Sequence, residues 1–346
     1  MAKVCVYIVW VIKMNLREMY EQTEEQLLSR YAVTASHSKG RLVDEPQCEL
    51  RTVFQRDVGR VIHCASFRRL KHKTQVFLSP DGDHYRTRLT HTLEVSQIAR
   101  TIARALRLNE DLTEAISVGH DLGHPPFGHA GERTLNRLSP AGFEHNVQSL
   151  RVVDAIEKNG EGLNLTWEVR DGILHHTGEP AATLEGHVVH VSDRIAYINH
   201  DIDDAIHAGV LHGEDIPLEI RKVLGNSYTD RINTLVTDIV RHSIDAPALH
   251  MSGEVEDAMN SLREFLFARV YTNPVVKGEE SKADGMIAAL YEFYHDNPDL
   301  MPMQYIETAF REDVDRAVCD YIAGMSDNYA LAVYYDNFIP KGWNKR

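Results

Sequence analysis

The sequence predicts an all-α protein. Aliphatic and alanine residues recur at helical spacing along the 346-residue chain, whereas alternating β-branched stretches are scarce. One such helical set is Leu93, Ile98, Ile102 and Leu106. Hydrophobic residues make up 43% of the chain, which is sufficient for a real core in one large or two ordinary domains.

The first region, residues 1–28, is interpreted as an extension and a leading helix. Val4–Ile12 is almost wholly apolar, but it is too short to span a bilayer, and no small-residue cleavage site follows it. Because Met14 opens a polar, start-like segment, residues 1–13 are interpreted as an over-extended start or a short ordered extension. The leading helix is predicted over Leu16–Tyr31.

The second region, residues 29–85, is expected to pack on the core and contains a basic stretch. Its cations are Arg51, Arg56, Arg60, Arg68, Arg69, Lys71 and Lys73. The formal net charge of the chain is −14, which argues against a general nucleic-acid binder. This local reversal of charge therefore indicates an anion-facing surface, and the alternative is a solvated helix face with Val58, Ile62 and Phe67 turned inward. Ser79–Asp83 is a turn by composition.

Residues 86–208 form the predicted core region, and residues 209–346 form a C-terminal helical region. Core helices are predicted over Thr90–Leu106, Leu112–Leu122, Asn146–Glu157, Trp167–His175 and Gly186–Ala208, with a loop at Asn136–Gly142. Later helices are predicted over Asn226–Ala246, Val255–Tyr271, Lys282–Asp296 and Ile306–Ala323, with a break at Pro274–Glu280.

The cysteines and histidines indicate the compartment and the chemistry. Cys5, Cys48, Cys64 and Cys319 are widely scattered, which is typical of reduced thiols in a cytoplasmic protein, and no membrane association is expected. The chain has 19 histidines, and histidine is the commonest protein metal ligand.

The segment HDLGHPPFGH, from His120 to His129, is the most informative part of the chain. His120 and Asp121 offer a metal one neutral nitrogen and one anionic oxygen, and His124 and His129 follow closely. Such groups are costly to bury unpaired. A metal or acid–base site is therefore favoured over the alternative of a solvated polar turn.

Four groups can be assembled into one metal site: His91, His120, Asp121 and Asp193. Their separations place them on three different helices, as when a metal lies in the core of a bundle. Arg88 shares a helix face with His91, and a cation there would repel the metal unless an anion lay between them. This predicts a phosphate between the metal and Arg88, and the alternative is a salt bridge from Arg88 to a nearby carboxylate.

Two further sets of polar residues surround these groups. Asp193, Tyr197 and Asp201 share one helix face, with Arg194 beside the first, although Asp201 could belong to a solvated acidic run and Tyr197 to the core. Glu132 follows His129 at i+3, so it can orient the imidazole and raise its basicity. His145 supplies either another contact or a simple N-cap or loop hydrogen bond.

These motifs resemble those of HD-domain metal-dependent phosphohydrolases, specifically the bacterial dGTPase and dGTPase-like deoxynucleoside triphosphate triphosphohydrolases. The resemblance covers nearly everything after about Leu50. Its strongest segments are FRRLKHKTQVF (Phe67–Phe77), DHYRTRLTHTLEV (Asp83–Val95), GHDLGHPPFGHAGE (Gly119–Glu132), FEHN (Phe143–Asn146) and SDRIAYINHDIDDA (Ser192–Ala205). Weaker similarity continues through SLREFLFARVY (Ser261–Tyr271) to YIAGMSDNYAL (Tyr321–Leu331).

The resemblance implies an HD-domain helical bundle with additional N- and C-terminal helices, and it implies roles for individual residues. Metal ligation falls to His91, His120, Asp121 and Asp193, and contacts with the triphosphate fall to Arg88, Arg194, Tyr197 and Arg263. The catalytic histidines and acid are His124, His129 and Glu132. Asp201 matches a sugar 3′-hydroxyl contact and Tyr271 a nucleoside contact, and these two matches, with that of Arg263, rest on a looser alignment. Residues 209–346 would complete the nucleotide site and form the contacts of a homo-oligomer, a tetramer or hexamer.

The expected reaction is hydrolysis of a deoxynucleoside triphosphate, dGTP or several, to deoxynucleoside and tripolyphosphate. Mixed N and O ligands suit Mn, Fe, Co, Ni or Zn, and a second, looser Mg can bind between the phosphates. One rival is another HD-type activity on nucleoside monophosphates or cyclic nucleotides. The other is a nucleotide-sensing or single-stranded-DNA-binding protein with vestigial catalysis. The residues carry no readable code for base preference or for an allosteric nucleotide.

Overall fold

The computed structural model describes residues 15–75 and 86–341, with backbone only at 274–277, and this part is all-α, as predicted. Its only strand-like pairings are isolated bridges between Arg41 and Thr166 and between Thr74 and Thr87. The predicted extension 1–13 and the predicted turn Ser79–Asp83 lie outside the described residues. None of the described helices is both long and apolar enough to cross a membrane.

The helices up to residue 207 include those of the predicted core region. They are α2 (Leu16–Leu27), α3 (Val53–Ile62), α4 (Ala65–Arg69), α5 (Arg88–Ala105), α6 (Glu110–Gly119), α7 (Gly128–Leu138), α8 (His145–Arg151), α9 (Trp167–Leu174) and α10 (Leu184–His207). The later helices are α11 (Leu218–Leu224), α12 (Tyr228–Ser243), α13 (Gly253–Leu266), α14 (Pro274–Asp296), α15 (Met303–Arg311), α16 (Val314–Ala323) and α17 (Asp327–Phe338). Helices therefore extend the core region at both of its ends.

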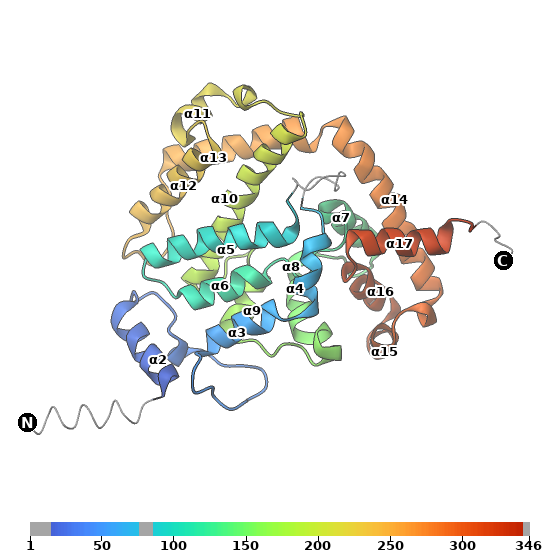
Figure 1. The fold of residues 1–346 in the computed structure, drawn as a ribbon, viewed down its shortest axis with the longest axis horizontal. Coiled ribbons are helices and arrows are strands. Elements are labelled where there is room, and N and C mark those ends of the chain that lie inside the picture. The colour runs from blue at the N-terminus through green and yellow to red at the C-terminus, as the bar shows by residue number, and fades with distance from the viewer. Residues whose placement is uncertain (1–14, 76–85, 342–346) are drawn as a thin grey trace, which may run out of the picture.

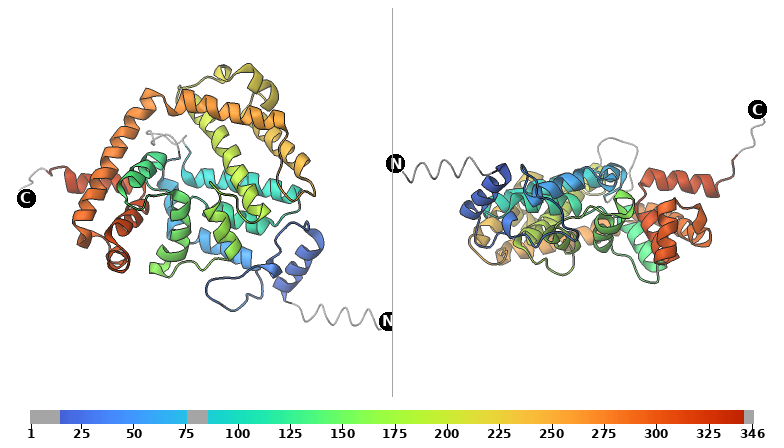
Figure 2. Two further views of the ribbon diagram at one scale, coloured as in Figure 1. Left: turned by 180° about the vertical axis from the view of Figure 1, so that it is seen from behind. Right: turned by 90° about the horizontal axis from the view of Figure 1, so that it is seen from below.

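The long helices α5 and α10 form the centre of the fold. Thr87 caps α5 and Thr183 caps α10, each through a side-chain oxygen that accepts a backbone N–H three residues later. α5 packs against α6 and α10, and α6 also contacts α3 and α9. Figure 1 shows α10 crossing α5 near the middle of the molecule, with α2 and α17 at opposite ends, and Figure 2 shows the same separation of the ends from two other sides.

Two hydrophobic clusters make up the core. The larger one joins helices from α3 to α13, and the smaller one joins α7, α14, α15, α16 and α17. The connection between α6 and α7 passes from one to the other, because Leu122 is buried in the larger cluster and Phe127 in the smaller. The HDLGHPPFGH segment is therefore anchored in both clusters.

Several predicted helix bounds were wrong for identifiable reasons. The leading helix ends at Leu27 rather than Tyr31, because Leu28 is already extended. The helix predicted over Leu112–Leu122 ends at Gly119, so His120 and Asp121 follow it. The predicted helix Ile306–Ala323 is two helices, since Asp313 caps a new one by accepting the N–H of Arg316.

Prolines and glycines account for two of the other errors. The predicted break at Pro274–Glu280 is helical, because Pro274 occupies the first position of α14, where proline is tolerated. α7 was not predicted, since its start is hidden among Pro125, Pro126 and Gly128, and it extends to Leu138 inside the predicted loop Asn136–Gly142. Helices α3, α4, α11 and α17 were also not predicted as such. On α3, Ile62 does not turn inward and is 38% exposed.

Candidate functional site

The four side chains predicted as metal ligands face one another. His91 comes from α5, His120 and Asp121 from the turn after α6, and Asp193 from α10. His91 Nε2 lies 3.0 Å from Asp193 Oδ1 and 3.9 Å from Asp121 Oδ2. His120 Nε2 lies 3.6 Å from Asp121 Oδ2 and 3.9 Å from Asp193 Oδ1. The ligands thus come from two helices and a turn rather than from three helices.

The chemistry of this group fits a divalent cation. His120 Nδ1 lies 2.7 Å from the carbonyl oxygen of Ser117, so Nδ1 carries the hydrogen and Nε2 has the free lone pair. That Nε2 atom is buried and has no hydrogen-bond partner among the described residues. Two nitrogens and two carboxylates are a donor set that transition metals accept.

The two carboxylates of this group supply the negative charge that a cation requires. Burial opposes ionisation of Asp193, but the hydrogen bond and charge of His91 hold its pKa below the usual value. Asp121 is buried as well, and its pKa is nonetheless lowered because His120 and Arg88 lie beside it. Both carboxylates are therefore ionised at neutral pH.

Arg88 forms a salt bridge to a nearby carboxylate, which the sequence analysis gave as the alternative to a bridging phosphate. Its Nη1 donates to Asp121 Oδ2 over 2.8 Å, and both side chains are buried. Its Nε atom has no hydrogen-bond partner in the described part of the chain. The guanidinium therefore neutralises one carboxylate of the site and retains a donor for a further anion.

A second cluster lies next to the first and is built on Glu132. Its Oε2 accepts from His129 Nδ1 at 3.1 Å, and its Oε1 accepts from both the Nδ1 (2.7 Å) and the backbone N–H (2.8 Å) of His145. The ring of His124 stacks on His145 with centroids 4.1 Å apart, and His124 Nε2 lies 3.7 Å from Asp121 Oδ1. His124 therefore connects the two clusters.

The members of the second cluster differ in charge and accessibility. Burial raises the pKa of Glu132, but hydrogen bonds from His129 and His145 lower it far more, so this carboxylate stays ionised. Burial and the charge of Arg88 lower the pKa of His124, which is therefore neutral. His129 differs from both, since its side chain is 64% exposed. The combination offers a solvent-facing imidazole held by a half-buried carboxylate.

These two clusters provide more than one position for an ion. Asp121, His124 and His145 bring three ligand atoms within 4.8 Å of one another, and so do His124, His129 and Glu132. The second cluster can therefore act as an acid–base group or contribute to a second cation site.

Of the residues assigned to the nucleotide, Asp201 and Tyr271 are in contact. The Tyr271 hydroxyl donates to Asp201 Oδ2, while Asp201 Oδ1 is buried and has no partner among the described atoms. Asp201 is 1% exposed, so the alternative of a solvated acidic run is wrong for it. Burial raises its pKa to about 7.

Of the residues assigned to the triphosphate, Arg88 contacts Asp121, and the other three lie on α10 and α13. Arg194 donates to Asn260 at 3.1 Å. Tyr197 is half-buried, and burial raises its pKa although the nearby charges of Arg263 and Arg194 act in the opposite direction. Arg263 is exposed on α13, so the two arginines near this phenol differ in their exposure to solvent.

Two buried histidines were missed by the sequence analysis. His176 Nε2 lies 3.1 Å from His145 Nε2, and its ring is 5.0 Å from that of His120. Burial and the neighbouring His120 lower its pKa to about 3. His200 contacts His91 from α10. Neither has a ligand partner at a regular spacing in the sequence, so periodicity could not reveal them.

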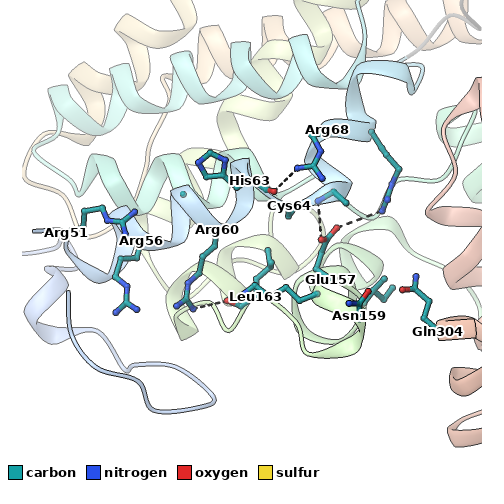
Figure 3. Close-up of a pocket in the computed structure, with 15 residues that line it drawn as sticks. Arg51, Arg56, Arg60, His63, Cys64, Arg68, Glu157, Asn159, Leu163 and Gln304 are labelled. Atoms are coloured by element: carbon teal, nitrogen blue, oxygen red, sulfur yellow. Dashed lines mark hydrogen bonds and ion pairs between the residues drawn. The ribbon is translucent and has the colours of Figure 1, made fainter. Parts of the chain in front are cut away.

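The basic stretch forms a separate pocket of about 640 Å³, which none of the predicted site residues lines. Figure 3 shows Arg51, Arg56 and Arg60 on one side of it and Arg68 on the other, with Glu157 below Arg68. Arg56 and Arg60 pair with Glu45, whereas Arg51 and Arg68 have no carboxylate within 4.0 Å in the described part of the chain.

Lys73 corrects the prediction for the basic stretch. It is buried, and its Nζ donates to the backbone oxygens of His124 (2.5 Å) and Ala323 (2.7 Å). Burial lowers its pKa to about 7. This lysine therefore supports the histidine segment and does not face solvent anions.

Comparisons with known proteins agree with this geometry. The HD domain family matches residues 88–198, which contain all four predicted ligands, and the phosphohydrolase-associated domain family matches residues 249–336. A solved structure, a hypothetical protein from Aquifex aeolicus, is similar in fold with a TM-score of 0.51 and 19% identity, covering 82% of this chain and 68% of that one.

Full-length relatives are more similar. A deoxyguanosinetriphosphate triphosphohydrolase-like protein from Caldanaerobacter subterraneus subsp. tengcongensis is 55% identical over 331 residues, covering 95% of this chain and 98% of the relative. A protein of the same name from Clostridium tetani is 48% identical over 341 residues with the same coverage. This chain therefore belongs to the deoxyguanosinetriphosphate triphosphohydrolase-like family of HD-domain phosphohydrolases.

Proposed function

We propose that the protein hydrolyses a deoxynucleoside triphosphate to deoxynucleoside and inorganic tripolyphosphate. One observation carries the proposal: a group of side chains able to hold one ion lies beside a solvent-facing imidazole that a half-buried carboxylate holds. His91, His120, Asp121 and Asp193 would hold a divalent cation, Mn, Mg, Fe, Co, Ni or Zn. Such an ion supplies Lewis-acid activation of the phosphate and of the attacking water.

The remaining residues have complementary roles in this proposal. His129, oriented by Glu132, would protonate the 5′-oxygen as it leaves. Arg88 has a free buried donor, and with Arg194, Tyr197 and Arg263 it would bind the triphosphate. His124 and His145 would contact the α-phosphate region, while Asp201 and Tyr271 would contact the sugar and nucleoside.

The test is incubation of the protein with each deoxy- and ribonucleoside triphosphate in the presence of Mn²⁺, followed by chromatography of the products. The proposal requires intact tripolyphosphate and a nucleoside in equal amounts. Release of pyrophosphate or phosphate instead would refute it. Turnover of nucleoside monophosphates or cyclic nucleotides alone would support the other HD-type activity.

A second candidate function rests on the basic pocket. Its arginines Arg51 and Arg68, which have no carboxylate within 4.0 Å among the described residues, favour a nucleotide-sensing or single-stranded-DNA-binding protein with vestigial catalysis. Such binding would weaken steeply with salt, because phosphate contacts release counterions. A salt-sensitive DNA shift without any nucleotide turnover would select this candidate over the first.

A homo-oligomer, a tetramer or hexamer, is the assembly we expect from the family resemblance. Analytical ultracentrifugation at several protein concentrations tests it, and a monomer throughout would contradict it.

A further inference from the structure

The two ligand-type histidines of the first cluster are oriented in different ways. A metal-bound histidine usually donates its other ring N–H to a carboxylate, a carbonyl oxygen or water, which fixes the tautomer. His120 follows this pattern through the carbonyl oxygen of Ser117. The outer nitrogen of His91 instead faces a third imidazole, since its Nδ1 lies 3.4 Å from Nδ1 of His200.

The surroundings of His200 determine which nitrogen carries the hydrogen. Its Nε2 lies 3.1 Å from Oε2 of Glu94, and neither atom has a hydrogen bond of regular geometry to any described residue. A carboxylate can only accept, and a lone pair on Nε2 would repel it at this distance. Nε2 of His200 therefore carries the hydrogen. A neutral imidazole has one N–H, so Nδ1 of His200 must be the acceptor.

The same reasoning then fixes His91. If Nδ1 of His200 accepts, Nδ1 of His91 must donate, so Nε2 is the ring nitrogen of His91 left to bind a cation. Nε2 is the atom that faces the two carboxylates of the candidate metal site, at 3.0 Å from Asp193 and 3.9 Å from Asp121. A cation bound between these side chains would take the place of the hydrogen that Nε2 shares with Asp193.

Glu94, the outermost residue of this series of contacts, is itself held by Arg86. Arg86 Nε lies 3.3 Å from Glu94 Oε2, and Arg86 Nη1 donates to Asp203 (2.9 Å) and Asp204 (2.8 Å) at the end of α10. The series therefore runs across α5 and α10 between the metal site and the surface. His200 itself is fully buried, and its ring is perpendicular to that of His91 with centroids 5.6 Å apart.

We propose that His200 is a positioning residue that holds His91 in the tautomer and ring orientation needed to bind a metal ion. The proposal rests on the proposed function only in its use of His91 as a ligand. An apolar residue of similar size would fill the same space, and a buried imidazole is costly unless its nitrogens are used. The contacts of both nitrogens of His200 point to that use.

The experiment measures Mn²⁺ affinity of the full-length protein without nucleotide, by titration calorimetry and by the electron paramagnetic resonance signal of free Mn²⁺. The variants are His200→Phe, which keeps the ring volume, and His200→Asn, whose amide oxygen can accept near the position of Nδ1. His187→Phe is the control, since His187 lies on the same helix and its hydrogen bond goes to the carbonyl oxygen of Ala181.

The expected result is that H200F weakens Mn²⁺ binding about 10- to 100-fold, the usual effect of losing an outer partner of a ligand. H200N should restore most of the affinity, and H187F should leave it unchanged. The melting temperature of the metal-free H200F variant should match that of H187F. An Mn²⁺ affinity of H200F within about twofold of the wild type would overturn the proposal. Equal losses in H200F and H200N would also overturn it, because they indicate a packing role.

A second variant covers the case in which H200F does not fold. Glu94→Leu removes the acceptor at a half-exposed position, and it should weaken Mn²⁺ binding in the same direction. Unchanged affinity in E94L would contradict the proposal. Tight Mn²⁺ binding by the wild type without release of tripolyphosphate would refute the proposed reaction but leave this test of His200 valid.

Discussion

Replacing His129 by alanine separates proton transfer from metal binding. The His129 side chain is 64% exposed and hydrogen-bonds to Glu132 at 3.1 Å, so its loss should change the free energy of unfolding by less than about 0.5 kcal/mol. It does not belong to the His91, His120 and Asp193 group, so the affinity of that group for a cation should be nearly unchanged.

The effect on turnover should be large by contrast. A positioned general acid contributes about 10²- to 10⁴-fold to the rate, which corresponds to about 2.7–5.4 kcal/mol of transition-state stabilisation. We therefore expect kcat of H129A to fall by at least about 10²-fold at saturating Mn²⁺ and nucleotide.

The assay combines three measurements on one preparation: kcat from tripolyphosphate release, metal content by atomic emission, and melting temperature. His207→Ala is a matched control, because His207 is similarly exposed on α10 and contacts an acidic residue, Asp203. Loss of metal in proportion to activity would refute the division of labour between the two clusters. An unchanged kcat would refute the role of His129 as the acid.

Three further predictions concern metal, pH and packing. Adding Mn²⁺ at about 100 times its dissociation constant should stabilise the folded protein by about 2.7 kcal/mol in thermal melts, and Asp193→Ala should abolish this gain; equal stabilisation of both proteins would contradict the assigned ligand. Burial raises the pKa of Glu185 from 4.5 to about 7, so the folded state keeps a proton that the unfolded state releases, and stability contributed by this group falls as pH rises from 4.5 to about 7. Denaturant titrations should show this fall, of at most about 3 kcal/mol, to be smaller in Glu185→Gln, and an identical pH profile would count against it. A Cβ on Gly123 would overlap the backbone of His145 and Ser149 at α8, so Gly123→Ala should cost about 1–3 kcal/mol in urea unfolding and should also lower kcat; wild-type stability would disprove the close packing.

The sequence predicted the parts of the fold that depend on local signals. α5 and α10 were placed within a few residues from apolar periodicity alone, and the structure shows that each begins two residues earlier, after a capping threonine, Thr87 or Thr183. α7 was missed because Phe127, just before it, has a positive φ of 63° that a phenylalanine rarely adopts. That conformation is maintained by tertiary contacts, which a local pattern does not contain.

The candidate site was predictable to a similar extent. His120, Asp121, His124 and His129 are neighbours in the sequence, so composition alone reveals them. His91 and Asp193 are distant in the sequence, and they were included because ligands on separate helices can meet in the core of a bundle, an assignment that the family resemblance then also implied. His176 and His200 were missed because a single buried histidine has no periodic signal. Lys73 was misread because composition gives its charge but not its burial beneath His124.

The carboxylate of Asp327, at the first turn of α17, accepts the backbone N–H groups of Phe127 and Thr74. These bonds tie the strained turn before α7, and the strand-like residue near the start of the core region, to the first turn of α17. During synthesis on the ribosome, the histidine-rich turn therefore acquires these two contacts only after α17 has emerged. A nascent fragment ending before α17 would contain every proposed ligand and still lack the Asp327 carboxylate that positions the turn carrying some of them.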